Sequence, residues 1–319
     1  MNVRGKSIFV GLSGGVDSAV SATLLKRAGA QVTGVFIKGW YPPDMLCTWA
    51  AERRDAMRVA ARLRIPFLTL DASDDYKKGV VDYLIAEYGS GRTPNPDVMC
   101  NKEVKFGTFY RFAMDAGADA IATGHYRSGE KDQSYFLWAV PKAILATTIF
   151  PVGKMKKEDV RKIAKKFNLP VAGKKDSQGV CFLGSVSIEE FLKNEFGDDN
   201  PALLYTIGQR VGEVGLPSEA LAQDGPWYVV GKDVDKREIR VSKTRESVAR
   251  EVYFTDANWH DDPVRATSAQ VRYRGERCAG RVEGNRFVSS EPLCEIPAPG
   301  QSIVFYSDDE LIGGGIITV

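Results

Sequence analysis

The sequence predicts an α/β fold in which a doubly wound parallel sheet is followed by a small central domain and a C-terminal antiparallel β-barrel. Strand-like and helical patterns alternate from residue 7 to residue 126, which is typical of a parallel sheet with helices on both faces. After about residue 200, short β-rich runs are separated by Gly and Pro, as in small antiparallel sheets and barrels. These strands are expected at 227–232, 238–243, 252–256, 268–275, 281–288, 302–307 and 313–319. We place the domains at 1–195, 196–248 and 249–319.

The first half begins with a βαβ unit. A strand-like run at 7–12 leads into a glycine loop, an apolar segment with helical spacing from Val16 to Leu24, and a second strand-like run at 31–37. The remaining elements expected in this half are a helix near 51–64, a strand at 67–71, a helix opened by Ser73, a helix near 104–116 and a strand-like run at 119–126.

Residues 142–175 are strongly basic, with ten Lys or Arg against two acids. Within this segment Val160, Ile163, Ala164 and Phe167 recur at helical spacing and predict an amphipathic helix. The basic face of this helix is either simply exposed to solvent or in contact with RNA.

Composition excludes several classes of protein. The chain has 319 residues, 44% of them hydrophobic, and 43 Lys plus Arg against 41 Asp plus Glu. These values exclude a disordered tail, a collagen-like fibre and a disulfide-stapled miniprotein, and the length predicts two or three domains. The net charge of +2 neither indicates nor excludes nucleic-acid binding, because such binding depends on local clusters of charged side chains and not on the net charge. No apolar run approaches the roughly 18 residues of a membrane span, so we expect a cytoplasmic protein without a membrane partner.

The cysteines and histidines restrict the chemistry. Cysteines stand at 47, 100, 181, 278 and 294 without any C-x-x-C pair, which argues against a disulfide framework and a structural zinc site. With only His125 and His260, multi-histidine metal sites and His-based triads are nearly excluded. We therefore expect cysteine and carboxylate groups to carry the chemistry, without a bound metal, and we expect Cys278 and Cys294 to be packing residues.

The sharpest motif is SGGVDS at 13–18, between the first strand and the first helix. It is neither a Walker A loop nor G-x-G-x-x-G. Two glycines allow the backbone to approach an anion closely, two serines supply hydroxyl donors, and the helix that follows directs its N-terminal N–H groups to the same point. The motif therefore predicts a phosphate site, in preference to a plain glycine turn.

Two polar segments each hold one further cysteine: TPNPDVMCNKEVKF at 93–106 and KDSQGVCFL at 175–183. Pro94 and Pro96 are expected to stiffen the first segment and keep it out of a helix until after Cys100. Asp97 lies three residues before Cys100, a spacing that suits a carboxylate and a thiol acting on one substrate atom. A cysteine is more often a small buried hydrophobe than a nucleophile, but the polar neighbours of both cysteines favour chemistry.

SGGVDS resembles the pyrophosphate loop of the ATP-pyrophosphatase (PP-loop) superfamily. The whole chain closely resembles the tRNA-specific 2-thiouridylase family, from the first strand to GGGIIT at 313–318. Besides the loop and the two cysteine segments, the motifs that carry this resemblance are GHY at 124–126, KDQSYFL at 131–137, YTIGQR at 205–210, RYRG at 272–275 and APGQSIVFY at 298–306.

The resemblance implies adenylation of the C2 oxygen of the wobble uridine by ATP, followed by attack of persulfide sulfur and release of AMP. Mg²⁺ would accompany ATP, and no permanently bound cofactor is implied. The family's ATP contacts fall on Gly11, Leu12, Ser13, Gly14, Gly15, Val16, Asp17, Ser18, Ile37 and Gly124.

By the family pattern, Cys181 carries the persulfide and Cys100 attacks it or forms a disulfide with it, while Asp97 holds the target base and serves as a general base. The implied tRNA contacts are Asn95, Pro96, Asp97, His125, Lys131, Asp132, Gln133, Arg272, Tyr273 and Gln301. The implied partners are a tRNA anticodon stem-loop and a persulfide donor such as a cysteine desulfurase or a sulfur-relay protein.

Three alternatives remain open. A 4-thiouridine synthase would share the loop but usually carries an added N-terminal RNA-binding region, whereas here the loop begins within the first dozen residues. A small-molecule synthetase would share the loop but has no use for paired cysteines in polar segments. A non-enzymatic RNA-binding protein would need a loop that no longer works, which the intact SGGVDS disfavours.

Overall fold

The computed structural model describes residues 2–42, 49–129, 131–175, 187–197, 200–211, 226–244 and 247–318. The chain forms two compact units. Unit 1 comprises residues 1–81 and 97–187, and unit 2 comprises residues 82–96 and 188–319.

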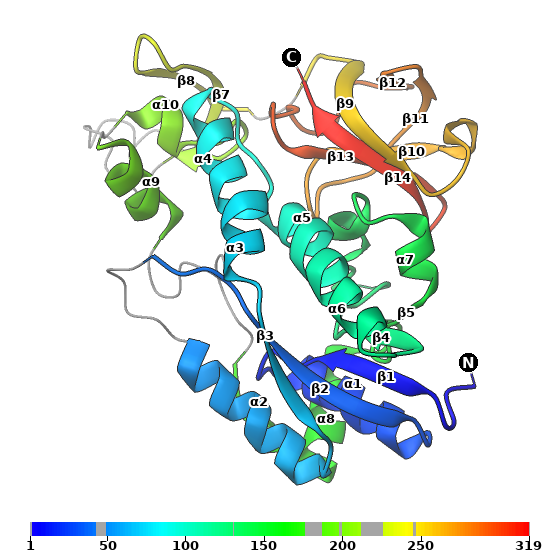
Figure 1. The fold of residues 1–319 in the computed structure, drawn as a ribbon. Helices are drawn as coiled ribbons and strands as arrows, with labels where there is room; N and C mark the ends of the chain where they lie inside the picture. Colours follow the sequence, from blue (N-terminus) through cyan, green and yellow to red (C-terminus); the bar gives the residue numbers. More distant parts are fainter. Residues whose placement is uncertain are drawn as a thin grey trace. The chain divides into compact units, whose positions relative to one another are not determined.

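Unit 1 is built on a five-stranded parallel sheet in the order β3-β2-β1-β4-β5 (Figure 1). The strands are β1 (Ser7–Gly11), β2 (Gln31–Lys38), β3 (Phe67–Asp71), β4 (Ala120–Ala122) and β5 (Thr148–Ile149). The order reverses between β1 and β4, as in doubly wound folds. The predicted fold class is therefore confirmed, although the run expected at 119–126 is a strand over only three residues.

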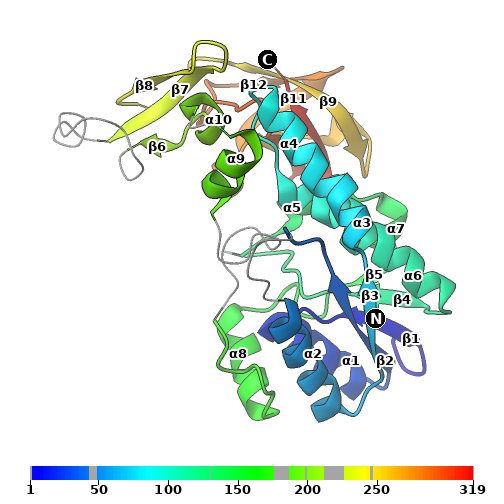
Figure 2. The same ribbon diagram turned by 60° about the vertical axis from the view of Figure 1, so that its left-hand side comes forward.

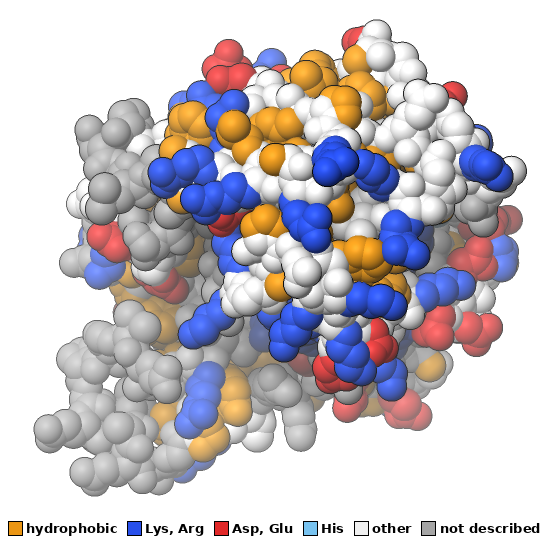
Figure 3. Space-filling view, turned by 90° about the horizontal axis from the view of Figure 1, so that it is seen from below, with side chains coloured by type: hydrophobic (Ala, Val, Ile, Leu, Met, Phe, Trp, Pro, Cys, Tyr) orange, Lys and Arg blue, Asp and Glu red, His pale blue; other side chains and the backbone are white. Residues whose placement is uncertain are grey.

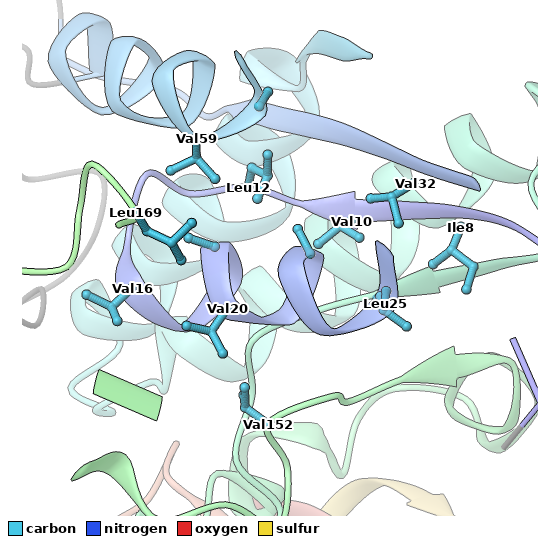
Figure 4. Packing of buried hydrophobic residues seen from close by; sticks show 14 of the residues in the cluster. Ile8, Val10, Leu12, Val16, Val20, Leu25, Val32, Val59, Val152 and Leu169 are labelled. Carbon is cyan, nitrogen blue, oxygen red and sulfur yellow. The ribbon is translucent and has the colours of Figure 1, made fainter. Parts of the chain in front are cut away.

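Helices cover both faces of this sheet (Figure 2). The helices of unit 1 are α1 (Val16–Arg27), α2 (Trp49–Leu63), α3 (Ser73–Tyr76), α6 (Phe109–Asp115), α7 (Lys142–Ala146) and α8 (Lys157–Lys166), with a 3₁₀ turn at Ser134–Leu137. Residues of α1, α2 and α8 share one apolar core with Ile8 and Val10 of β1. Figure 4 shows the part of this core formed by β1, α1 and α2. On the other face, Phe9 of β1 meets Phe112 of α6 edge to face, with ring centroids 6.4 Å apart. Alternate residues of β1 thus face opposite helical layers, as a central strand requires.

Two helical segments contain stretches of π-helix. Lys77–Val81 continues α3 into α4 (Asp82–Gly89), and Cys100–Thr108 joins α5 (Pro96–Met99) to α6. The helix expected near 104–116 therefore begins at Pro96, and the prediction that the prolines keep Cys100 out of a helix is wrong. Proline is well suited to the first turn of a helix, where its missing N–H has no intrahelical partner.

The basic segment forms α8 with the predicted amphipathic character. Val160 and Ala164 are buried in the unit 1 core, whereas Lys162, Lys165 and Lys166 are exposed. Figure 3 shows basic side chains interspersed with apolar ones on the face seen there.

Unit 2 contains a closed six-stranded barrel in the order β10-β11-β12-β9-β14-β13 and a separate three-stranded sheet, β6-β7-β8. The barrel strands are β9 (Glu251–Trp259), β10 (Ser268–Gln270), β11 (Cys278–Glu283), β12 (Arg286–Ser289), β13 (Ser302–Ser307) and β14 (Glu310–Ile317). The other elements are α9 (Ile188–Phe196), α10 (Pro201–Leu204), β6 (Arg210–Val211), β7 (Trp227–Asp233), β8 (Glu238–Ser242) and a 3₁₀ turn at Pro263–Arg265.

Aromatic rings fill the barrel. The centroid of the Phe305 ring lies 5.0 Å from that of Phe254 and 5.1 Å from that of Trp259. The predicted antiparallel barrel is confirmed. The strand expected at 268–275 ends at Gln270, because the chain turns at Arg272–Gly275, where Arg274 has a φ of +62°. Among the described residues, no helix is both long and apolar enough to cross a membrane.

Candidate functional site

The predicted phosphate loop lies where the strand order of the unit 1 sheet reverses. In open α/β sheets, ligands bind outside the carboxyl ends of the strands at such a switch point. Here the loop after β1 meets the loop after β4, because Gly124 lies directly against the first turn of α1. A Cβ atom at Gly124 would stand 2.9 Å from the backbone nitrogen of Ser18 and 3.0 Å from the carbonyl carbon of Asp17. Only glycine permits this close approach.

The loop is held in shape by its own glycine and serines. Gly14 has a φ of +74°, and a Cβ atom there would overlap the carbonyl oxygen of Glu52 in α2. The hydroxyls of Ser13 and Ser18 are 3.3 Å apart, and the Ser18 hydroxyl donates to the carbonyl of Gly15 at 3.2 Å. The conformation places backbone N–H groups at the start of α1, the arrangement that binds phosphate.

Two of the predicted ATP contacts, Leu12 and Val16, can reach a nucleotide only through backbone atoms. Leu12 and Val16 are buried in the unit 1 core, where Figure 4 labels them, and the Leu12 N–H donates to the carbonyl of Val35 at 2.7 Å. Gly11 ends β1, and Ile37 is half-buried near the end of β2. Any contact that Leu12 or Val16 makes with a nucleotide is therefore through the main chain.

Two lysines from the basic segment reach the loop. Lys157 Nζ lies 2.7 Å and 2.8 Å from the two carboxylate oxygens of Asp17, which also accepts from the Tyr126 hydroxyl at 2.8 Å. Lys174 Nζ donates to the Gly14 carbonyl at 3.1 Å and to Asp55 at 2.9 Å. Sequence reasoning missed both as site residues; the basic composition of 142–175 was the only signal for them.

His125 is neutral in the folded protein. Its ring is half-buried between Phe106 and Phe150, and its Nδ1 lies 2.9 Å from the Thr123 hydroxyl. Burial, with the nearby charges of Lys105 and Arg127, lowers the pKa of His125 to about 3. It can therefore donate or accept a hydrogen bond at neutral pH but brings no positive charge.

The segment at 131–133 fastens the loop that carries His125. The Tyr126 N–H donates to Gln133 Oε1 at 3.0 Å, and the Gln133 N–H donates to the Tyr126 carbonyl at 3.0 Å. Asp132 accepts from the backbone N–H of Ser134 at 2.8 Å and from its hydroxyl at 3.0 Å. Lys131 is half-buried beside them. These contacts order the loop after β4.

The residues expected to act together on the substrate differ in exposure. Asp97 is exposed on the first turn of α5, whereas Cys100 is 3% exposed at the start of the π-helical stretch. Cys181 lies outside the described residues, and so does Cys47. The structure therefore does not test whether Cys100 and Cys181 meet.

The π-helical stretch after Cys100 has two unusual features. A Cβ atom at Gly107 would stand 2.8 Å from the carbonyl oxygen of Lys102, so the wider turn needs a glycine there. Asn101, 2% exposed, donates to the Phe136 carbonyl at 3.0 Å, but its Oδ1 has no hydrogen-bond partner within the described part of the chain. Stretches of π-helix often occur at functional sites.

In unit 2, Gln301 holds the residues that lead to Asn95 and Pro96. Its side-chain amide donates to the carbonyls of Thr93 at 2.9 Å and Pro94 at 3.1 Å. The Thr93 hydroxyl also lies 3.2 Å from Lys232 Nζ, and burial lowers the pKa of that lysine to about 8. A barrel loop and β7 thus anchor the same short segment.

Arg272 joins two segments of unit 2 by contacts with Glu295, Gly208 and Ile207, an arrangement called here the Arg272 clamp. Its guanidinium lies 3.2 Å from the Glu295 carboxylate and donates to the carbonyls of Gly208, at 3.2 Å, and Ile207. Glu295 is 9% exposed. Tyr273, the next residue, is half-buried. Arg272 therefore connects the YTIGQR turn to the barrel.

Comparisons with known proteins agree with this architecture. A model of the tRNA methyl transferase HUP domain matches residues 6–185, which is more than half of the chain. A tRNA methyl transferase PRC-barrel domain matches residues 186–243, and an aminomethyltransferase β-barrel domain matches residues 249–317. The chain is also 38% identical to a tRNA-specific 2-thiouridylase MnmA of Streptococcus mutans, over 97% of this chain and 94% of that one.

The chain belongs to the tRNA-specific 2-thiouridylase family. A second family member, from Geobacillus thermodenitrificans, is 39% identical over 97% of this chain and 94% of its own length. Among solved structures, NMN synthetase from Francisella tularensis is similar over 61% of this chain and 73% of that chain, with 16% identity and a TM-score of 0.39. Similarity at that level carries no argument about function.

Proposed function

We propose that this protein carries out the reaction for which its relatives are named, the ATP-dependent 2-thiolation of the wobble uridine in a subset of tRNAs. The observation that carries the proposal is the phosphate loop at the sheet's switch point. At both Gly14 and Gly124, a Cβ atom would collide with neighbouring backbone. Such packing brings main-chain groups close enough together to form a backbone cradle.

ATP would bind with its phosphates at the loop Gly11–Ser18 and its nucleoside near Ile37 and Gly124. The backbone N–H groups at the start of α1 supply the donors. The loop itself contains no lysine, and Lys174, at 3.1 Å from the Gly14 carbonyl, is a cation close to it. Mg²⁺ brought in with ATP would offset the remaining phosphate charge.

The reaction needs two displacements. The C2 oxygen of uridine attacks the α-phosphorus of ATP and pyrophosphate leaves, which converts a poor leaving group into AMP. In the second stage the Cys100 thiolate attacks the inner sulfur of a Cys181 persulfide, which forms a disulfide and frees hydrosulfide. Hydrosulfide attacks C2 and AMP leaves. A dithiol reductant then converts the Cys100–Cys181 disulfide into two thiols before the next turnover, and is itself oxidised to a disulfide.

Cys100 is buried, so its thiolate has to become accessible before it meets a persulfide. Asp97, which is exposed one helical turn earlier, would hold the base and accept its N3 proton as a general base.

The tRNA contacts proposed are Asn95, Pro96, Asp97, His125, Lys131, Asp132, Gln133, Arg272, Tyr273 and Gln301. For Gln133, Arg272 and Gln301, intramolecular hydrogen bonds support a positioning role beside any contact with RNA. His125, being neutral, would contact RNA as a hydrogen-bonding or stacking group. We propose the division at residues 195 and 248, a cytoplasmic location, and a cysteine desulfurase or a sulfur-relay protein as the donor.

The test is nucleoside mass spectrometry of unmodified tRNA after incubation with the protein, ATP, Mg²⁺ and a cysteine desulfurase. We expect 2-thiouridine only in the presence of ATP. Formation of 4-thiouridine would instead indicate the other thiolase. AMP release that depends on a metabolite and not on tRNA would indicate a small-molecule synthetase. ATP binding without AMP formation would indicate a binding protein.

A further inference from the structure

Two cysteines outside the proposed sulfur-transfer site lie side by side in the barrel unit. Cys278 is the first residue of β11, and Cys294 lies in the segment between β12 and β13. Their sulfur atoms are 3.4 Å apart, and the backbone N–H of Cys294 donates to the Cys278 sulfur at 3.5 Å. Both are free thiols. The expectation that they serve only to pack the strands does not account for this pairing.

Contacts of the surrounding residues hold the two cysteines next to each other. Cys278 pairs with Ala269 of β10 in the barrel. The residue after Cys294, Glu295, is held by Arg272, and the residue before it, Leu293, donates its N–H to the Ala249 carbonyl at 2.9 Å. A disulfide requires about 2.05 Å between the sulfurs. Closing the gap thus needs a movement of little more than an ångström, within reach of side-chain rotation and a small shift of one segment.

The two thiols differ in accessibility. Cys278 is 5% exposed, whereas Cys294 is exposed at the surface. An external reagent therefore meets Cys294 first, and Cys278 is already in contact with the sulfur that would have reacted.

We propose that Cys278 and Cys294 form a dithiol site that is oxidised to an intramolecular disulfide by low-molecular-weight disulfides such as oxidised glutathione. The Cys294 thiolate attacks one sulfur of the reagent, forms a mixed disulfide and releases one glutathione thiol. Cys278 then attacks the Cys294 sulfur, forms the Cys278–Cys294 bond and releases the second glutathione. Two protein thiols are oxidised, one glutathione disulfide is reduced, and the two thiol protons leave with the two glutathione molecules.

The hydrogen bond to Cys278 and partial burial raise the pKa of Cys294 to about 11. The thiolate that starts the exchange is therefore a small fraction at neutral pH, so the first step is slow. The second step is intramolecular and should be fast by comparison, because the attacking sulfur is already in place.

The disulfide would also brace the Arg272 clamp. It would tie β11 to the residue next to Glu295, the carboxylate that pairs with Arg272, and Arg272 in turn holds the carbonyls of Ile207 and Gly208. The site does not depend on the proposed thiolation, because it involves neither Cys100 nor Cys181.

The test is carried out on the full chain with Cys47, Cys100 and Cys181 replaced by serine, so that only the barrel thiols can react. After treatment with oxidised glutathione, we expect intact-mass spectrometry to show the loss of two hydrogens, reversed by dithiothreitol. A non-reducing peptide map should join the peptide containing Cys278 to the one containing Cys294. The same joined peptide should appear in the wild-type chain, which covers the case in which the triple variant fails to fold.

Single replacements on that background assign the order of steps. Cys278→Ser should accumulate one glutathione on Cys294, whereas Cys294→Ser should remain unmodified. The proposal is wrong if the dithiol protein itself retains a glutathione on Cys294, or if neither thiol reacts while circular dichroism shows a folded protein. Because the background lacks the sulfur-transfer cysteines, failure of this test leaves the proposed function untouched.

Discussion

The phosphate loop and the residues expected to contact tRNA differ in how they are built. The loop's key positions gather at one point, where Gly14 and Gly124 let backbone approach backbone. The expected tRNA residues are divided between the two units. Three of them are already hydrogen-bonded within the protein: the side chains of Arg272 and Gln301 donate to backbone carbonyls, and the Gln133 side chain accepts from the Tyr126 N–H. The phosphate loop is a ligand cradle made of main chain, whereas Gln133, Arg272 and Gln301 of the expected tRNA residues hold neighbouring segments of the protein in position.

This comparison separates two kinds of motif residue. A glycine in a binding loop indicates a position where a Cβ atom would collide with neighbouring backbone, so no other residue can replace it. A glutamine or arginine has donors that serve a ligand or an internal carbonyl equally well, and only the structure shows which carbonyls lie within reach.

Replacement of Gly14 by alanine should have the largest effect. The new Cβ atom would overlap the Glu52 carbonyl, and the residue would keep a left-handed φ. We expect thiolation and ATP-dependent AMP formation to fall at least about 100-fold. Gly117→Ala is the matched control, since Gly117 has a φ of +80° but nothing within 4 Å of its Cβ position. Equal ATP affinity in Gly14→Ala and wild type would show that the loop does not bind the phosphates.

Replacement of Arg272 by methionine tests the Arg272 clamp. It leaves the buried Glu295 without its ion-pair partner, and we expect unfolding free energy to fall by about 2 kcal/mol, less than for a fully buried pair because both groups retain some exposure. Arg274→Met is the control. Arg274 is exposed, and its Cζ lies 5.2 Å from the centroid of the Tyr273 ring, so we expect little loss of unfolding free energy.

The same pair of variants distinguishes a positioning role of Arg272 from direct contact with RNA. If Arg272 acts mainly through RNA phosphate, Arg272→Met should be as stable as Arg274→Met in urea denaturation. The salt dependence of its tRNA affinity should then fall by the equivalent of about one phosphate contact.

Replacement of Gln301 by leucine should have an intermediate effect. The change keeps the approximate shape of the side chain but removes both donors to the segment at Thr93 and Pro94. We expect kcat/KM for tRNA to fall about tenfold, with ATP affinity unchanged. Gln31→Leu, on the exposed start of β2, is the control. A loss of ATP affinity in Gln301→Leu would contradict a role limited to the tRNA side.

Replacement of His125 by glutamine should have the smallest effect at neutral pH. Because His125 is uncharged there, the slope of tRNA affinity against salt should not change, whereas Lys131→Met should reduce it. A smaller slope in His125→Gln would show that the imidazole is protonated in the complex.

The same variant should change the acid stability of the protein. Burial favours neutral His125 in the folded state, so its contribution is complete above the unfolded pKa near 6.5 and is lost as the pH falls toward about 3. Urea denaturation between these pH values should show wild-type stability falling more steeply than that of His125→Gln. Parallel curves would mean that the histidine is not desolvated.

Local patterns predicted most of the fold. The alternation of strands and helices from β1 to β4, the amphipathic α8 and the C-terminal barrel follow from periodicity and turn residues, whereas α7 and β5 were not predicted. Element ends were predicted less well. Pro96 starts a helix instead of delaying one, and the expected strand at 268–275 stops at Gln270, since proline tolerates a first helical turn and the chain bends at Arg274.

The phosphate loop could be predicted from the sequence, because a glycine loop between a strand and a helix acts through backbone geometry that neighbouring residues impose. The alternation that makes a parallel sheet could be predicted in the same way. The structure was needed to show that Lys157 and Lys174 approach the loop, that Gln301 holds Thr93, and that the sulfur atoms of Cys278 and Cys294 lie 3.4 Å apart. Each of these contacts joins residues distant in the chain, and distances between such residues are set by how strands and helices pack, which periodicity along the chain does not encode.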